Sequence, residues 1–124
     1  MPKDPKIQYD LYLAERVEKR LTSNGLTEVK KMMGGLVFMV NDKMCVGVDK
    51  DRITGEDRLM VRVGTLPYEK LLFKKGSREM DFTGKVMKGF LFISPEGFDS
   101  DEDLEFWIEK ALEFNKIIID KAKR

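Results

Sequence analysis

The chain has 124 residues, of which 42% are hydrophobic and 36% are charged, and its 23 basic and 22 acidic residues leave a formal net charge of +1. This length and apolar content predict a single domain, residues 1–124, with one hydrophobic core. The balanced charge argues against a protein that binds polyanions over its whole surface, and the single cysteine excludes an internal disulfide.

The N-terminal segment, residues 1–7, contains two prolines and three charged residues, which predicts a loose tail. It lacks the apolar stretch of a secretion signal, and the longest apolar run in the chain, residues 36–40, is far shorter than a membrane span. We therefore expect a cytoplasmic protein that does not contact a membrane. A helix is predicted over residues 9–23, because apolar residues recur there on one face at helical spacing.

The most apolar part of the chain, residues 29–48, predicts strands around a tight hairpin. Residues 26–32 lead into the first strand, which Gly34-Gly35 interrupts as a turn or a bulge. Asn41-Asp42 forms a two-residue connection that tolerates positive φ. The strands on both sides of this connection are apolar on both faces, which indicates the middle of a sheet.

The second half predicts a strand at 58–63, a short helix over 65–73 capped by Thr65, strands at 79–82 and 89–94, and a long helix over 100–121. The long helix begins with a capping box, Ser100 to Asp103. The order is roughly α-β(3)-α-β(2)-α with short connections. It predicts an α+β fold of two layers, in which helices pack against an antiparallel sheet of about five strands.

Three blocks in this order resemble the TfoX (Sxy) N-terminal domain family. They are KMMGGLVFMVN at residues 31–41, LMVRVG at 59–64 and MDFTGKVMKGF at 80–90, and Trp107 follows in the last helix. The resemblance extends from about residue 9 to residue 119. The chain departs from the family pattern at Met33, where Phe is usual, and at Val86, where Pro is frequent.

The resemblance implies a two-layer α+β fold of the kind also seen in secretion chaperones, and a link to the regulation of natural competence. That link belongs mainly to longer proteins with a second, C-terminal domain. This chain is similar to the stand-alone members, for which no activity is established. The family pattern contains no catalytic residues to carry over.

The residues themselves offer no recognisable catalytic or cofactor-binding machinery. The chain contains no histidine, so neither a Cys-His pair nor a Ser-His-Asp triad exists. Cys45 lies in the middle of a predicted strand and is expected to be a buried, inert thiol. Carboxylates alternate over residues 99–105 as in a calcium loop, but Leu104 and Lys110 replace its turn glycine and bidentate glutamate. We therefore expect no enzyme, no metal site and no cofactor.

Two groups of residues are candidates for binding. Alternation in the strand at 58–63 places Met60 and Arg62 on the face opposite Leu59 and Val61, where Met60 is expected to belong to an exposed protein-contact face. The second group is basic and would form a patch for phosphates or an acidic partner, although a solvated loop face explains it as well. Its members are Lys74, Lys75, Arg78, Lys85 and Lys88, with Lys30 and Lys31 as further contributors.

The leading hypothesis is a non-catalytic protein-interaction domain with an unidentified protein partner, which the resemblance connects with competence or transcription. One alternative is a nucleic-acid-binding module that uses residues 74–88, and its affinity would fall steeply with salt. Another is an enzyme with carboxylates such as Glu79 or Asp81 as acid–base groups. A homodimer is expected if one face of the sheet is left apolar.

Overall fold

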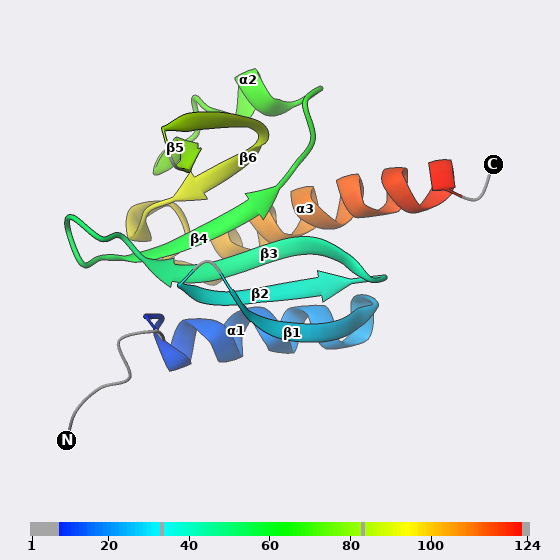
Figure 1. Ribbon diagram of the computed structural model, residues 1–124, viewed down its shortest axis with the longest axis horizontal. Coiled ribbons are helices and arrows are strands. Elements are labelled where there is room, and N and C mark those ends of the chain that lie inside the picture. The colour runs from blue at the N-terminus through cyan, green and yellow to red at the C-terminus, as the bar shows by residue number, and fades with distance from the viewer. Residues whose placement is uncertain (1–7, 33, 83, 123–124) are drawn as a thin grey trace.

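The computed structural model describes residues 8–32, 34–82 and 84–122, which form one antiparallel sheet with helices packed on one of its faces (Figure 1). The predicted tail, residues 1–7, lies outside the described part of the chain. The elements in chain order are α1 (Leu11–Leu21), the 3₁₀ turn η1 (Thr22–Asn24), β1 (Leu26–Met32), β2 (Gly35–Val40), β3 (Lys43–Lys50), β4 (Asp57–Arg62), α2 (Tyr68–Leu71), β5 (Ser77–Phe82), β6 (Lys85–Ile93), the 3₁₀ turn η2 (Pro95–Gly97) and α3 (Asp101–Ala122).

The predicted two-layer α+β architecture is confirmed, with six described strands in the order β1-β2-β3-β4-β6-β5 instead of about five. The extra strand arises at Gly34, which has a φ of +81° and reverses the chain, so that Met32 pairs with Gly35. The residues before and after this turn are therefore two strands, not one interrupted strand.

The segment after β4 also differs from the prediction. The helix expected over 65–73 is a single turn, α2, and its N-cap residue is Pro67. The Thr65 side chain does not cap it; the Thr65 carbonyl accepts a hydrogen bond from the Tyr68 N–H at 3.4 Å. The following strands are longer than predicted, since β5 and β6 extend towards a turn at Gly84, whose φ is +80°.

All three α-helices contribute to a single hydrophobic core on one face of the sheet, which we call the covered face. The helices begin where side chains can satisfy free N–H groups: Asp10 accepts from the Leu13 N–H at 2.9 Å, and Ser100 accepts from the Asp103 N–H at 3.1 Å. The largest fully buried side chain is Trp107, whose Nε1 donates to the Gly97 carbonyl at 3.0 Å.

One polar contact ties α3 to the central hairpin. Asn115 is only 3% exposed, and its Nδ2 donates to the Val40 carbonyl at 2.9 Å. Its Oδ1 accepts from Nδ2 of Asn41 at 2.9 Å. Asn41 and Asp42 have φ angles of 51° and 65°, which confirms the positive-φ hairpin predicted at this connection. The buried amide therefore fixes the position of the hairpin against the helix.

The opposite face of the sheet, which we call the open face, is turned towards the viewer in Figure 1, with α3 behind the strands. Its buried apolar side chains, Val37, Met60 and Met80, are not part of the core beneath the helices. Among the described residues no helix is long and apolar enough to cross a membrane.

Candidate functional site

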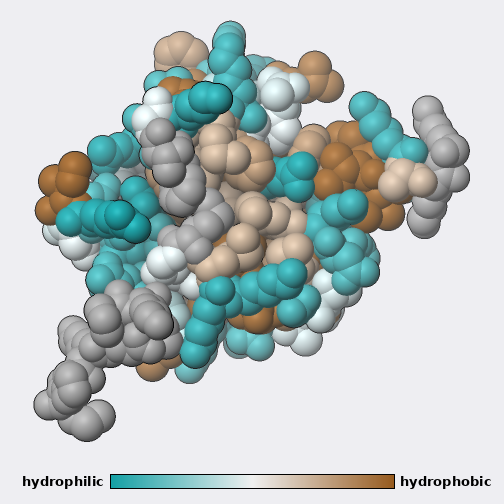
Figure 2. All heavy atoms as spheres, viewed as in Figure 1, coloured by the Kyte–Doolittle hydropathy of each residue, from teal (hydrophilic) through white to brown (hydrophobic). Residues whose placement is uncertain are grey.

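The open face carries a row of side chains that crosses all six strands. Each member is paired with the next in the strand register, so the row lies straight across the sheet. Its members, from β1 to β5, are Lys30, Val37, Gly47, Met60, Phe92 and Arg78. The centre of the row is apolar and both ends are basic. Figure 2 shows apolar side chains at the centre of this face with mostly hydrophilic side chains around them, and a further apolar area at the right-hand side of the view.

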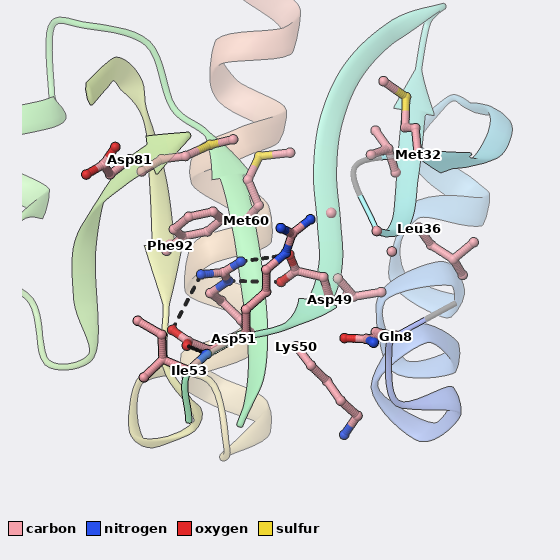
Figure 3. Close-up of a pocket in the computed structure, with 18 residues that line it drawn as sticks. Gln8, Met32, Leu36, Asp49, Lys50, Asp51, Ile53, Met60, Asp81 and Phe92 are labelled. Carbon is pink, nitrogen blue, oxygen red and sulfur yellow. Dashed lines mark hydrogen bonds and ion pairs between the residues drawn. The ribbon is translucent and has the colours of Figure 1, made fainter. Parts of the chain in front are cut away.

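A groove of about 840 Å³ runs over the middle of this row, and we call it the open-face groove. Gly47 contributes no side chain to its floor, and a Cβ atom at that position would approach Cε of Met60 to 3.1 Å. Met60 and Phe92 lie to one side of the groove and Met32 to the other (Figure 3). At its mouth lies Ile53, which is 94% exposed.

A network of charged side chains closes one end of the groove. Nε and Nη2 of Arg58 donate to the two carboxylate oxygens of Asp49 at 3.0 and 2.9 Å. Nη1 of Arg58 lies 3.5 Å from Oδ2 of Asp51, and the guanidinium stands 3.7 Å from the ring centroid of Phe92. Dashed lines in Figure 3 trace the contacts to both aspartates. Held by two carboxylates and an aromatic ring, the arginine is fixed in place as part of the groove wall.

The loop after β3 is ordered by Asp51 and presents Ile53. Oδ1 of Asp51 accepts from the N–H groups of Ile53 at 2.8 Å and Thr54 at 3.1 Å. These two hydrogen bonds, chiefly that of Thr54, lower the pKa of Asp51, and the nearby Arg58 lowers it further. The side chain of Ile53 is not part of the core and projects into solvent beside the groove.

The lining of the groove is balanced in charge. It contains three acidic and three basic residues, namely Asp49, Asp51, Asp81, Lys50, Arg52 and Arg58. A surface of this composition attracts neither polyanions nor polycations at long range.

Met60 lies on the face that the alternation predicts, but it is only 5% exposed, so the expectation of an exposed Met60 is wrong. It lines one side of the groove, between its register partners Gly47 and Phe92. Arg62 lies at the end of the same strand, with its guanidinium 5.4 Å from the ring centroids of both Phe90 and Phe114.

The predicted basic group is divided between the two faces of the sheet. Nζ of Lys74 stands 4.3 Å from the ring centroid of Phe106 on α3, whereas Arg78 pairs with Phe92 in the row on the open face. Lys30 and Lys31 are successive residues of β1 and point to opposite faces. The other members, Lys75, Lys85 and Lys88, are exposed. The basic residues therefore do not converge on one face.

Cys45 is 1% exposed, which confirms the predicted buried thiol. The strand register explains its orientation: Phe38 pairs with Val46 and Met39 with Met44, so Cys45 is the extra residue of a bulge and joins the core. Burial raises the pKa of this thiol to about 12, against a smaller lowering by Arg62. Within residues 8–32, 34–82 and 84–122, no group of three or more His, Cys, Asp or Glu side chains is arranged to hold a metal ion.

The profile of the TfoX N-terminal domain matches residues 19–115, from the last turn of α1 well into α3. The chain belongs to the TfoX N-terminal domain family. This result confirms the family expected from the three sequence blocks. The matched segment contains all six described strands and every lining residue of the groove except Gln8. A search of curated proteins and a search of solved structures each found no match.

Sequence reasoning missed the groove and the network at its end. A signal existed, because Asp49 and Arg58 flank one polar loop between two strands. If the two strands pair as a hairpin around that loop, the two residues lie opposite each other, as they do in the structure. The depression at Gly47 had no comparable signal, since a glycine in a strand also occurs where nothing binds.

Proposed function

We propose that this chain is a non-catalytic protein-interaction domain that binds a partner protein through the open-face groove. The competence and transcription roles linked to its family support a regulatory task. The observation that carries the proposal is the combination of an apolar row on the helix-free face with a 94% exposed isoleucine at the groove mouth. Exposed apolar side chains beside an apolar groove are typical of protein contact sites.

The partner should present an apolar segment. The six charges of the lining balance, and the cation stacked on the ring of Phe92, Arg58, is already engaged by two carboxylates. The floor is closed, since Val37 is 3% and Met80 is 1% exposed. The partner therefore lies on the groove without penetrating the sheet, and Ile53 packs against it from the rim.

The two alternatives have less support. A nucleic-acid site requires converging cations, and the basic residues are divided between the faces of the sheet. An acid–base site requires a carboxyl group positioned in the groove. Asp81 lines the groove but has no hydrogen bond or ion pair with another described residue, and Glu79 lies beside Tyr68 and not in the groove lining.

The test compares two substitutions of equally exposed residues. Ile53 is 94% and Leu66 is 95% exposed, both lie outside helices and strands, and only Ile53 lines the groove. The tagged wild type, Ile53→Asp and Leu66→Asp are used for quantitative affinity capture from a lysate of the native cells. We expect a partner that is retained by the wild type and by Leu66→Asp, and reduced at least tenfold with Ile53→Asp.

Nuclease and salt provide the second part of the test. A partner held by apolar contact survives nuclease treatment and binds equally at low and high salt. If every captured protein is retained equally by Ile53→Asp and the wild type, the groove is not the contact site. Partners lost with nuclease, or released steeply as salt rises, would instead favour the nucleic-acid alternative.

A further inference from the structure

The strand β1 is a long, exposed edge of the sheet. It has seven residues, it pairs with β2 and with no other strand among the described residues, and Thr27 to Met32 are all exposed. Alternate residues of an edge strand direct their N–H and C=O groups away from the sheet, where another strand can pair with them. The register of β1 with β2 shifts only near its start, between Leu26 and Glu28, so residues 28–32 pair regularly. The opposite edge, β5, is less suited to pairing because its register shifts in the middle of the strand, between Glu79 and Asp81, and Met80 is buried.

From this edge we infer that two copies of the chain associate through antiparallel pairing of β1 with β1, in the register that places Val29 opposite Val29. The two sheets then form one continuous sheet of twice the width. The inference goes beyond the proposed function and does not depend on it, because pairing uses the main-chain edge of β1, although Met32 at the end of this strand also lines the groove.

Symmetry restricts the register. Two antiparallel edge strands in one sheet can be related by a two-fold axis only if that axis is perpendicular to the sheet. Such a rotation leaves every side chain on its own face of the sheet. Residues that lie opposite each other must therefore point to the same face. In β1, Glu28 and Lys30 pair with open-face residues of β2, whereas Val29 pairs with Phe38 on the covered face. Only registers centred on a single residue of β1 satisfy this condition.

Charge then selects one register. Centring on Glu28, Lys30 or Lys31 places two like charges directly opposite each other, which is unfavourable, and Thr27 lies at the irregularity of the β1–β2 register. Centring on Val29 places the two valines together and sets Glu28 of each copy opposite Lys30 of the other. The strand is thus complementary to itself in this register, and the symmetry makes the ion pair twice.

Forming these pairs requires little disruption. Within one chain Nζ of Lys30 is 3.9 Å from Oε1 of Glu28, and the two side chains are 45% and 59% exposed. An exposed ion pair at this distance contributes little, so both side chains are free to reorient towards the second copy. Edge lysines also occur in proteins where they prevent strand pairing, and the experiment separates these two roles of Lys30.

The experiment measures the mass of the full chain by sedimentation equilibrium from roughly 10 µM to 1 mM, because an edge-to-edge contact of one strand buries little area and should be weak. We expect a monomer–dimer equilibrium for the wild type. Glu28→Lys and Lys30→Glu each create two like-charge pairs and should weaken the dimer about tenfold or more. The double variant with both substitutions should restore it.

Two further samples complete the design. A mixture of Glu28→Lys and Lys30→Glu should form heterodimers, since each chain supplies the charges that the other needs. Lys31→Glu makes the same charge change on the same strand, but Lys31 lies opposite Thr27 in the proposed register, so it should dimerise like the wild type. A wild type that stays monomeric throughout, or an equal effect of Lys30→Glu and Lys31→Glu, would overturn the inference.

Discussion

The two faces of the sheet are both closed, but in different ways. On the covered face, helices bury aliphatic and aromatic side chains, and the one buried polar residue among those described is Asn115. On the open face, side chains of the sheet itself cover the strands: the Arg58 guanidinium lies over Phe92, and Met60 lies over Gly47. A helix layer makes a face inaccessible to partners, whereas side chains of the sheet itself leave a groove.

The two faces also differ in whether they favour the neutral or the ionised form of a titratable side chain. Burial on the covered face favours the neutral form of Cys45 and raises its pKa to about 12. The open face favours an ionised group, because two backbone N–H groups and an arginine lower the pKa of Asp51. The covered face is therefore suited to stability, and the open face retains fixed charges beside an apolar surface, as a recognition site requires.

The largest expected effect is on the covered face. Trp107→Ala should lower the free energy of unfolding by about 4 kcal/mol, because it empties the largest buried site in the core. Met60→Ala on the open face should lower it by about 2 kcal/mol, since the groove already lies beside the truncated side chain. Urea unfolding followed by circular dichroism measures both. Equal losses would show that the open face stabilises the fold as much as the helix-covered core.

A smaller effect compares two ion pairs that are neighbours in the strand register but differ in geometry. Asp49 pairs with Arg58, and the next pair along the same two strands is Lys50 with Asp57. The first pair has two hydrogen bonds and side chains about 20% exposed; the second has one at 2.8 Å, with 39% and 33% exposed. Double-mutant cycles with alanine should give a coupling of about 1–2 kcal/mol for the first pair and roughly 0.5 kcal/mol for the second.

The matched cycles separate geometry from charge, because each removes one acid and one base between the same two strands. If the coupling energies are equal, the bidentate contact and the ring of Phe92 add nothing to the pair, and the rigid groove wall inferred from this network is not supported.

Local signals predicted much of this fold. Ser100 caps α3 and Asn41-Asp42 turns the hairpin, as the sequence indicated. These features depend on residues close in sequence. The turn at Gly34 was ambiguous, because a glycine pair suits a bulge and a hairpin equally well.

The candidate site was much less predictable, for a physical reason. Alternation assigned Met60 to the correct face but gave no information on what lies against it, which depends on Phe92, 32 positions later in the chain, and on the absent side chain of Gly47. Likewise, nothing local showed that Lys74 and Arg78 point to different faces. Exposure on a sheet face depends on the register of several strands, and register is a long-range property.

The smallest expected effect concerns pH and belongs to the open face. The pKa of Asp51 is lowered in the folded chain from its ordinary value of 3.8, so the folded state releases this proton more readily than the unfolded state. The resulting stabilisation is present above pH 3.8 and is lost as the pH falls through the folded pKa. Asp51→Asn retains an oxygen that accepts from Ile53 and Thr54 but cannot ionise.

Other carboxylates titrate in the same range, so the informative quantity is the difference in free energy of unfolding between the wild type and Asp51→Asn. We expect the wild type to be the more stable at about pH 6 and the advantage to shrink as the pH falls below 3.8. Urea unfolding at several values between about pH 6 and pH 2.5 measures it. An advantage that does not change with pH would mean that the loop presenting Ile53 is held by hydrogen-bond geometry alone, without a contribution from the charge of Asp51.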